Sequence, residues 1–179
     1  MVLFKAYDPK VEVNGETVLS VIAGVGAFKA QGIKILKDNG INNPKPGKWY
    51  SQQAWLDSFK TISEKLGNGT LKMIGKSIPK NAKWPAQIDS VKKALTSIDV
   101  AYHMNHRKGE IGHYKYESTS PKSGRMICNN PYPDAFDLGI IESVGEIFAK
   151  KGEFISVKQD EKAPNRSKGA DSTTYLITW

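Results

Sequence analysis

The chain has 179 residues and a formal net charge of +8; 39% of its residues are hydrophobic and 25% are charged. This composition is typical of a soluble globular protein of one domain, residues 1–179, and no apolar run approaches the roughly 20 residues of a membrane span. No secretory signal is visible at the amino terminus and Cys128 is the single cysteine, so we expect a cytoplasmic protein without an intrachain disulfide.

The positive charge is spread along the chain rather than gathered in one run. Lysine pairs such as Lys92 with Lys93 and Lys150 with Lys151 are typical of solvated helix faces, and only three of the 26 basic residues are Arg. Nucleic-acid binding normally needs basic residues on one face together with a recognition motif. We therefore expect no specific nucleic-acid partner.

The amino-terminal segment, residues 1–16, is expected to be an arm or an edge strand that ends in a tight turn at Asn14-Gly15. From Thr17 to about Lys37 the apolar spacing predicts one helix. Three glycines within it weaken the helix but let another backbone pack closely: Gly24, Gly26 and Gly32.

Three further helices are predicted before any strand pair. The first begins after Ser51, a favourable N-cap, and ends at Gly67. A shorter helix runs from about Thr70 to Ile78, and another starts near Asp89. Loops containing proline separate them.

From His113 the pattern changes to alternation. Residues 113–119 and 125–128 flank a turn and predict a β-hairpin. The prolines at 131 and 133 prevent helix or regular strand from running through Asn129 to Pro133, so the chain must turn there. We call residues 129–133 the elbow.

A buried helix is predicted after the elbow, with Asp134 as its N-cap and Gly152 as a left-handed cap at its end. One apolar face recurs at helical spacing: Phe136, Ile140, Ile141, Val144, Ile147 and Phe148. Residues 153–157 and 172–179 predict a second strand pair, joined by a mobile loop at 158–171. The fold class is therefore α/β (α+β): amino-terminal helices followed by a β-β-α-β-β antiparallel-sheet unit.

This element order, with its N-P-Y-P elbow, resembles the superfamily that joins vinyl-4-reductase-like ligand-binding domains, haem-nitric-oxide-binding domains and the vesicle-tethering TRAPP subunits. The residues that carry the resemblance are Asn130, Pro131, Tyr132, Pro133, Phe136, Gly139, Ile140, Ile141 and Glu142. Leu66-Gly67 and Leu71 with Gly75 are similar to the helix pair of this superfamily. The resemblance implies a pocket for a small molecule between helices and sheet, in a dimeric sensor or signalling protein rather than a catalyst.

Two departures from the pattern bear on cofactors. Metal-binding members carry paired cysteines around the elbow, whereas Cys128 stands alone, and we predict no metal site. Haem-binding members are marked by a histidine ligand and a Tyr-x-Ser-x-Arg phrase. Tyr116 and Ser118 match that phrase, but Ser120 stands at the position of its Arg, which opposes haem.

All three histidines lie between residues 103 and 113. His103 or His106 could be an axial haem ligand, or could join His113 and Glu110 in a metal site, since imidazole is a common metal donor. The spacing matches no zinc pattern, and the ordinary alternative is two polar residues at a helix end and one on a strand. Cys128 ends an apolar strand and is predicted to be a small buried hydrophobe.

The prediction is a sensory domain that binds a hydrophobic or aromatic molecule and forms a homodimer through its amino-terminal helices. The predicted ligand-binding residues are His103, His106, Tyr114, Tyr116, Tyr132 and Phe136. Three alternatives stay open: a haem or tetrapyrrole protein that uses His103 or His106, an enzyme, and a non-catalytic structural or tethering subunit. The sequence contains no catalytic triad order, G-x-S-x-G motif or C-x-x-C motif that would support the enzyme alternative.

Overall fold

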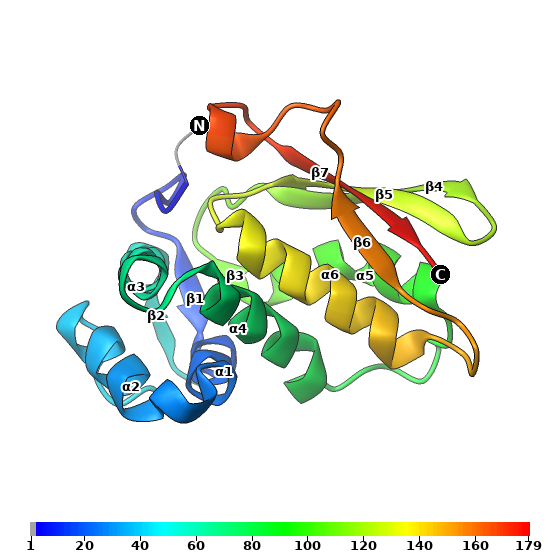
Figure 1. The fold of residues 1–179 in the computed structure, drawn as a ribbon. Helices are drawn as coiled ribbons and strands as arrows, with labels where there is room; N and C mark the ends of the chain where they lie inside the picture. The colour runs from blue at the N-terminus through cyan, green and yellow to red at the C-terminus, as the bar shows by residue number, and fades with distance from the viewer. Residues whose placement is uncertain (1–2) are drawn as a thin grey trace.

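A computed structural model of the protein describes residues 3–179, so Met1 and Val2 of the expected amino-terminal arm lie outside the described residues. The described chain forms six α-helices and two antiparallel sheets (Figure 1). The helices are α1 (Gly15–Gly24), α2 (Lys29–Asp38), α3 (Gln52–Leu66), α4 (Asn68–Asn81), α5 (Val91–Met104) and α6 (Asp134–Phe148), with short 3-10 helices η1 (Gly26–Phe28) and η2 (Arg166–Lys168).

The larger sheet confirms the predicted β-β-α-β-β unit. Its strands lie in the order β4-β5-β7-β6 and are β4 (His113–Ser120), β5 (Ser123–Asn129), β6 (Ser156–Gln159) and β7 (Thr173–Thr178). Each neighbouring pair is antiparallel, and Met126 in the middle of β5 lies opposite Tyr116 on one side and Tyr175 on the other. Helix α6 connects β5 to β6 and packs below the sheet, with α5 behind it (Figure 1).

The smaller sheet corrects two expectations for the amino-terminal segment. It consists of β1 (Glu12–Asn14), β2 (Trp49–Ser51) and β3 (His106–Arg107), and β1 is the middle strand rather than an edge. Asn14-Gly15 does not form a tight turn. The Asn14 side chain instead caps α1, because its Oδ1 accepts a hydrogen bond from the Thr17 backbone N–H at 2.9 Å.

The single helix expected from Thr17 to Lys37 is wrong. Helix α1 ends at Gly24, and Gly26 has a φ of +53°, in the left-handed region that glycine adopts readily. The chain bends by 112° there. Among the described residues no single helix is long and apolar enough to cross a membrane, although α1 and the segment Gly26–Asp38 pass the same length and composition test when taken together.

Helix α3 begins and ends as predicted. The Ser51 side chain accepts a hydrogen bond from the Ala54 N–H, and Gly67 has a φ of +80° directly after the last helical residue. Helix α4 is longer than expected because Pro79 lies within its last turn instead of beyond it. Helix α5 starts after Ser90.

The elbow leads directly into α6, as expected, but the residues that cap the two ends of the helix differ from the prediction. Pro133 is the N-cap, and the Asp134 carboxylate binds Arg166 and Thr173 instead of capping the helix. At the other end Ala149 is extended, so Gly152, with its φ of +89°, belongs to the following turn and not to the helix.

Helices α4 and α6 pack closely through two glycines. A Cβ on Gly75 would lie 2.1 Å from the Phe136 carbonyl oxygen, and a Cβ on Gly139 would lie 2.1 Å from the Lys72 carbonyl oxygen. Gly24 likewise packs on the Ile74 backbone, which confirms the close packing expected of that glycine. The contact fixes the start of α6, including Phe136, against α4.

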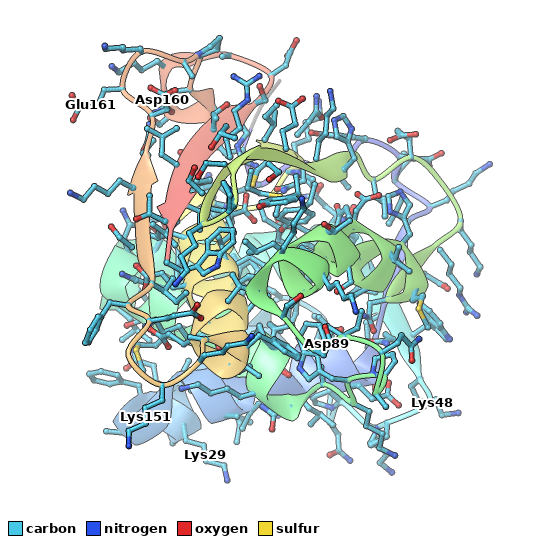
Figure 2. All side chains as sticks on the ribbon, turned by 90° about the vertical axis from the view of Figure 1, so that its right-hand side faces the viewer. Lys29, Lys48, Asp89, Lys151, Asp160 and Glu161 are labelled. Carbon is cyan, nitrogen blue, oxygen red and sulfur yellow. The ribbon has the colours of Figure 1, made fainter. Side chains whose placement is uncertain are left out.

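Many charged side chains lie at the periphery of the molecule. Figure 2 shows Lys29, Lys48 and Lys151 at its edge, and they belong to α2, to the loop before β2 and to the segment after α6. The absence of a nucleic-acid partner stays a prediction.

Candidate ligand-binding pocket

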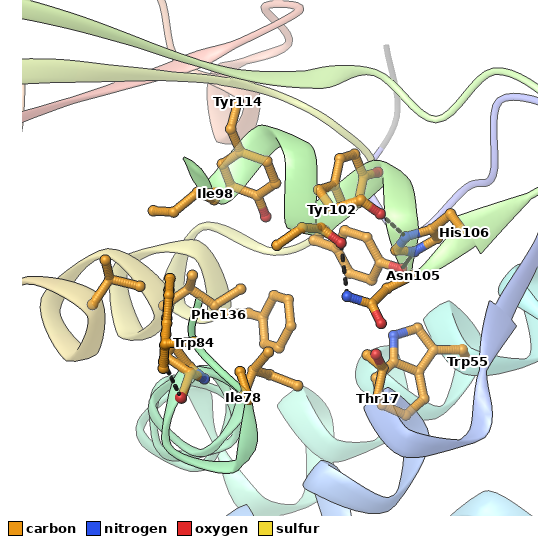
Figure 3. Close-up of a pocket in the computed structure, with 16 residues that line it drawn as sticks. Thr17, Trp55, Ile78, Trp84, Ile98, Tyr102, Asn105, His106, Tyr114 and Phe136 are labelled. Atoms are coloured by element: carbon orange, nitrogen blue, oxygen red, sulfur yellow. Dashed lines mark hydrogen bonds between the residues drawn. The ribbon is translucent and has the colours of Figure 1, made fainter. Parts of the chain in front are cut away.

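A pocket of about 100 Å³ lies between α4, α5 and α6 (Figure 3). Exposed Ala82 and Ala101 line its outer part, and buried aromatic side chains line its inner part. The full lining is Thr17, Trp55, Ile78, Pro79, Ala82, Trp84, Ile98, Ala101, Tyr102, Asn105, His106, Tyr114, Tyr132, Phe136, Ile140 and Val144. A larger hollow of about 410 Å³ lies beside Pro9 and Lys108, but its walls are mostly exposed side chains.

The polar inner end of the pocket is built on His106, Tyr132 and Gln52, which we call the histidine cluster. His106 Nδ1 lies 2.8 Å from the Tyr102 carbonyl oxygen, so this nitrogen must carry the proton and donate it. The His106 Nε2 then accepts from the Tyr132 hydroxyl at 2.7 Å, and the Tyr132 oxygen accepts from Gln52 Nε2 at 3.3 Å. All three side chains are buried.

Burial keeps this cluster uncharged. It lowers the pKa of His106 to about 4, so the imidazole is neutral at physiological pH. Burial also raises the pKa of the Tyr132 hydroxyl, and the Gln52 amide and the Trp55 indole oppose that shift. The pocket therefore presents neutral donors and acceptors at its inner end.

Two polar atoms in or next to this cluster have no hydrogen bond of ordinary geometry among the described residues. They are Trp55 Nε1 and Gln52 Oε1, and both side chains are 0% exposed. Trp55 lines the pocket from α3. The sequence placed Trp55 in the core because it fits the apolar stripe of α3, and no local pattern marks either residue as functional. A third unpaired atom, the Tyr116 hydroxyl, lies over Gly124 and outside the pocket.

Four of the six predicted ligand-binding residues line this pocket: His106, Tyr114, Tyr132 and Phe136. His103 does not. Its side chain is 51% exposed and its Nδ1 hydrogen-bonds the Asp99 carbonyl oxygen. Tyr116 lies on β4 outside the pocket, together with Ser118 and Ser120 of the haem-like phrase. The alternating pattern correctly predicted that Tyr114 and Tyr116 share a strand. Of these two, only Tyr114, near the start of that strand, lines the pocket.

A second buried cluster surrounds Arg166, and we call it the arginine cluster. The guanidinium Nη2 lies 2.6 Å from carboxylate oxygens of both Asp134 and Asp137, and Nη1 donates to Asn130 Oδ1 at 2.7 Å. Asp137 also accepts from the Tyr114 hydroxyl at 2.5 Å. Burial raises the pKa of Asp137, and Arg166 opposes that rise most strongly.

The segment 158–171 was expected to be a mobile loop. Arg166 of this segment binds Asn130, Asp134 and Asp137 and so holds it against the elbow and α6. Lys158 and Gln159 belong to β6, and Arg166 is 4% exposed. The sequence held no local sign of this contact because the two carboxylates lie about thirty residues earlier in the chain. The mobility of the segment stays a prediction.

The pocket does not fit a porphyrin. An apolar cavity of about 150 Å³ binds a single benzene ring, whereas a porphyrin joins four pyrrole rings and is several times larger than this pocket. Both nitrogens of His106 are already engaged in hydrogen bonds. None of the lining residues is Lys or Arg, so no cation faces the pocket to pair with propionates.

Other cofactor sites find little support in the described residues. Within residues 3–179, no group of three or more His, Cys, Asp and Glu side chains is placed to bind a metal ion. Cys128 is 0% exposed, as predicted for a small hydrophobe, and burial raises the pKa of its thiol.

Comparison with known proteins gives one kind of match. No family model and no curated protein match this chain. The solved structure of a T. Tengcongensis H-NOX variant covers 92% of this chain and 96% of its own, with a TM-score of 0.67 and 17% identity. An H-NOX protein from S. oneidensis, solved in an Fe(II)NO state, covers 90% and 97%, with a TM-score of 0.65 and 12% identity.

A third similar structure is described as an oxygen-binding H-NOX domain related to soluble guanylate cyclases. It covers 91% of this chain and 89% of its own, with a TM-score of 0.63 and 16% identity. The chain therefore has the fold of H-NOX domains over nine-tenths of its length. At such low identity the similarity establishes the fold alone.

Proposed function

We propose that this protein is a sensory domain that binds a small, largely apolar molecule inside an H-NOX fold. The observation that carries the proposal is the pocket between α4, α5 and α6, with apolar walls and a neutral polar inner end. Ligand sites are typically apolar pockets with a few precisely placed polar groups. Buried hydrogen-bond donors without an acceptor are rare in native structures, so each one calls for an explanation. Trp55 supplies such a donor.

The first test is native mass spectrometry of the protein purified from cells. We expect extra mass from a copurified organic molecule in the wild type. In Ala101→Phe, a ring at the outer part of the pocket should block entry and abolish the extra mass. Val100→Phe is the matched control, because Val100 is 61% exposed on the same helix and does not line the pocket.

A wild type without bound mass calls for a screen of small apolar compounds by thermal shift. Compounds that stabilise the wild type and Val100→Phe, but not Ala101→Phe, would support the proposal. If no compound separates these proteins, the pocket is not a binding site.

Haem is the alternative ligand, because another similar structure, with a TM-score of 0.68 and 18% identity, is described by its work on heme distortion in the H-NOX family. A neutral imidazole at the pocket wall favours it, since a metal-binding histidine commonly donates its other N–H to a carbonyl. The size of the pocket and the lack of facing cations oppose it. We expect hemin to give no stoichiometric Soret band. A stoichiometric band that His106→Ala removes and His103→Ala retains would establish the haem alternative.

The predicted homodimer also stays a proposal. Phe28 and Ile33 on η1 and α2 are 50% and 44% exposed, and exposed apolar groups of this kind support an association face on the amino-terminal helices. Light scattering should give a dimer for the wild type and a monomer for Ile33→Lys. Dimers in both proteins would move the interface elsewhere.

A further inference from the structure

The inner end of the pocket contains one hydrogen-bond donor that the fold leaves unused. Trp55 is 0% exposed and lines the pocket, and its indole N–H lies close to the Tyr132 hydroxyl but makes no hydrogen bond of ordinary geometry with it or with any other acceptor in the described residues. The Tyr132 oxygen nearby already accepts from Gln52 while its hydroxyl donates to His106. A buried N–H without an acceptor is unfavourable, so an acceptor on a bound molecule would relieve this defect.

A second tryptophan in the same pocket provides the contrast. The Trp84 indole also lines the pocket, but its N–H donates to the Pro79 carbonyl oxygen at 2.9 Å (Figure 3). Both rings supply apolar surface. Only one of these two indoles has a donor to offer to a ligand.

The side chains that line the pocket carry no charge. Its lining contains no Lys, Arg, Asp or Glu, and the His106 ring is committed to the Tyr102 carbonyl and the Tyr132 hydroxyl. The Asp137 carboxylate behind Tyr114 is already paired with Arg166. A charged group on a ligand would therefore lose its hydration without gaining a counter-ion.

From these three observations we propose that the pocket selects an uncharged molecule of about one small ring, whose hydrogen-bond acceptor receives the Trp55 N–H. The size limit follows from the volume of about 100 Å³. This inference rests on the proposed function and adds the chemical class of the ligand.

Three probes with the same five-membered ring separate the contributions of apolar surface, hydrogen-bond acceptor and charge. They are cyclopentane, cyclopentanone and cyclopentylammonium. Their binding is measured by titration calorimetry with the wild type, Trp55→Phe and Trp84→Phe. We expect the wild type to bind cyclopentanone about tenfold more tightly than cyclopentane, and cyclopentylammonium not at all. Trp55→Phe should lose the tenfold preference, and Trp84→Phe should keep it.

Indole N–H resonances provide a measurement on the unaltered protein if Trp55→Phe does not fold. In a ¹H–¹⁵N spectrum, cyclopentanone should shift the Trp55 indole proton downfield, as a new hydrogen bond does, and leave the Trp84 proton nearly unmoved. The spectra of Trp49→Phe, Trp84→Phe and Trp179→Phe identify three of the four indole resonances, so the fourth belongs to Trp55. A Trp55 proton that responds equally to cyclopentane and cyclopentanone would overturn the donor role.

The outcomes also separate this inference from the proposed function. Equal binding of cyclopentanone and cyclopentane would overturn the role of Trp55 and leave an apolar pocket standing. Tightest binding of cyclopentylammonium would overturn the neutral class. Failure of all three probes, together with no effect of Ala101→Phe in the ligand screen, would overturn both.

Discussion

Both buried polar clusters include residues of the elbow or of the start of α6. They differ in charge and in how many of their polar atoms have hydrogen-bond partners. In the arginine cluster, Arg166 binds two carboxylates and a side-chain amide oxygen. In the histidine cluster no group is charged, and Gln52 Oε1 has no partner. A completed ionic network stabilises one conformation, whereas an uncompleted neutral network next to a pocket leaves room for a ligand.

The largest expected effect comes from removing the cation of the arginine cluster. Arg166→Met leaves Asp137 buried without its counter-charge, which should lower the free energy of unfolding by about 3–5 kcal/mol. Urea unfolding measures it. Arg125→Met is the control, because its ion pair with Glu117 lies at the surface, with side chains 49% and 27% exposed, and should contribute far less to stability. Similar losses in both variants would contradict a structural role for the buried cluster.

The histidine cluster should show itself in the pH dependence of stability. The pKa of His106 falls from 6.5 to about 4 on folding, so between these pH values the unfolded chain binds more protons than the folded chain. The free energy of unfolding should therefore fall by up to about 3 kcal/mol as the pH drops from 6.5 to 4.

Two histidine variants isolate this contribution. His106→Gln should flatten the stability profile between pH 6.5 and 4, while His113→Gln, an exposed position on β4, should keep the wild-type slope. An unchanged slope in His106→Gln would show that the histidine cluster is not held neutral by burial.

Tyr114 joins the two clusters, because its ring lines the pocket and its hydroxyl donates to Asp137 at 2.5 Å. Tyr114→Phe removes a hydrogen bond to a charged group and should lower the free energy of unfolding by about 1.5–3 kcal/mol in thermal or urea unfolding. Tyr116→Phe is the matched control on the same strand. The Tyr116 hydroxyl has no partner in the described residues, so its loss should be neutral or stabilising. A larger loss in Tyr116→Phe than in Tyr114→Phe would refute this assignment.

The smallest effect is expected at a partly exposed ionic group between α4 and α6. Glu142 is 16% exposed and pairs with Lys72 at 2.8 Å and Lys76 at 3.1 Å, whose side chains are 36% and 20% exposed. Glu142→Gln should lower the free energy of unfolding by less than about 1 kcal/mol at low salt, and the difference should shrink in 1 M NaCl. A loss as large as that of Arg166→Met would remove the distinction between the fully buried and the partly exposed ion pairs.

The sequence by itself determined most of the elements, because their signals are local. Proline geometry predicted the elbow, and alternation predicted the hairpin of β4 and β5. Helical spacing predicted the buried face of α6 correctly at Phe136, Ile141 and Val144 but not at Ile147, which is 40% exposed. Local signals were misleading where a contact from elsewhere competed for the same group. Asp134 looked like an N-cap, but the distant Arg166 takes its carboxylate.

Only the tertiary structure decided the site. His103 and His106 are three residues apart and look equivalent in sequence, yet the end of α5 turns one to solvent and the other against Tyr132. Trp55 fits the core stripe of α3, and only the surroundings of its ring in the folded chain reveal that its N–H is unpaired. Helical periodicity specifies which face of an element is buried, but hydrogen-bond partners are set by residues far along the chain, and no local pattern encodes them.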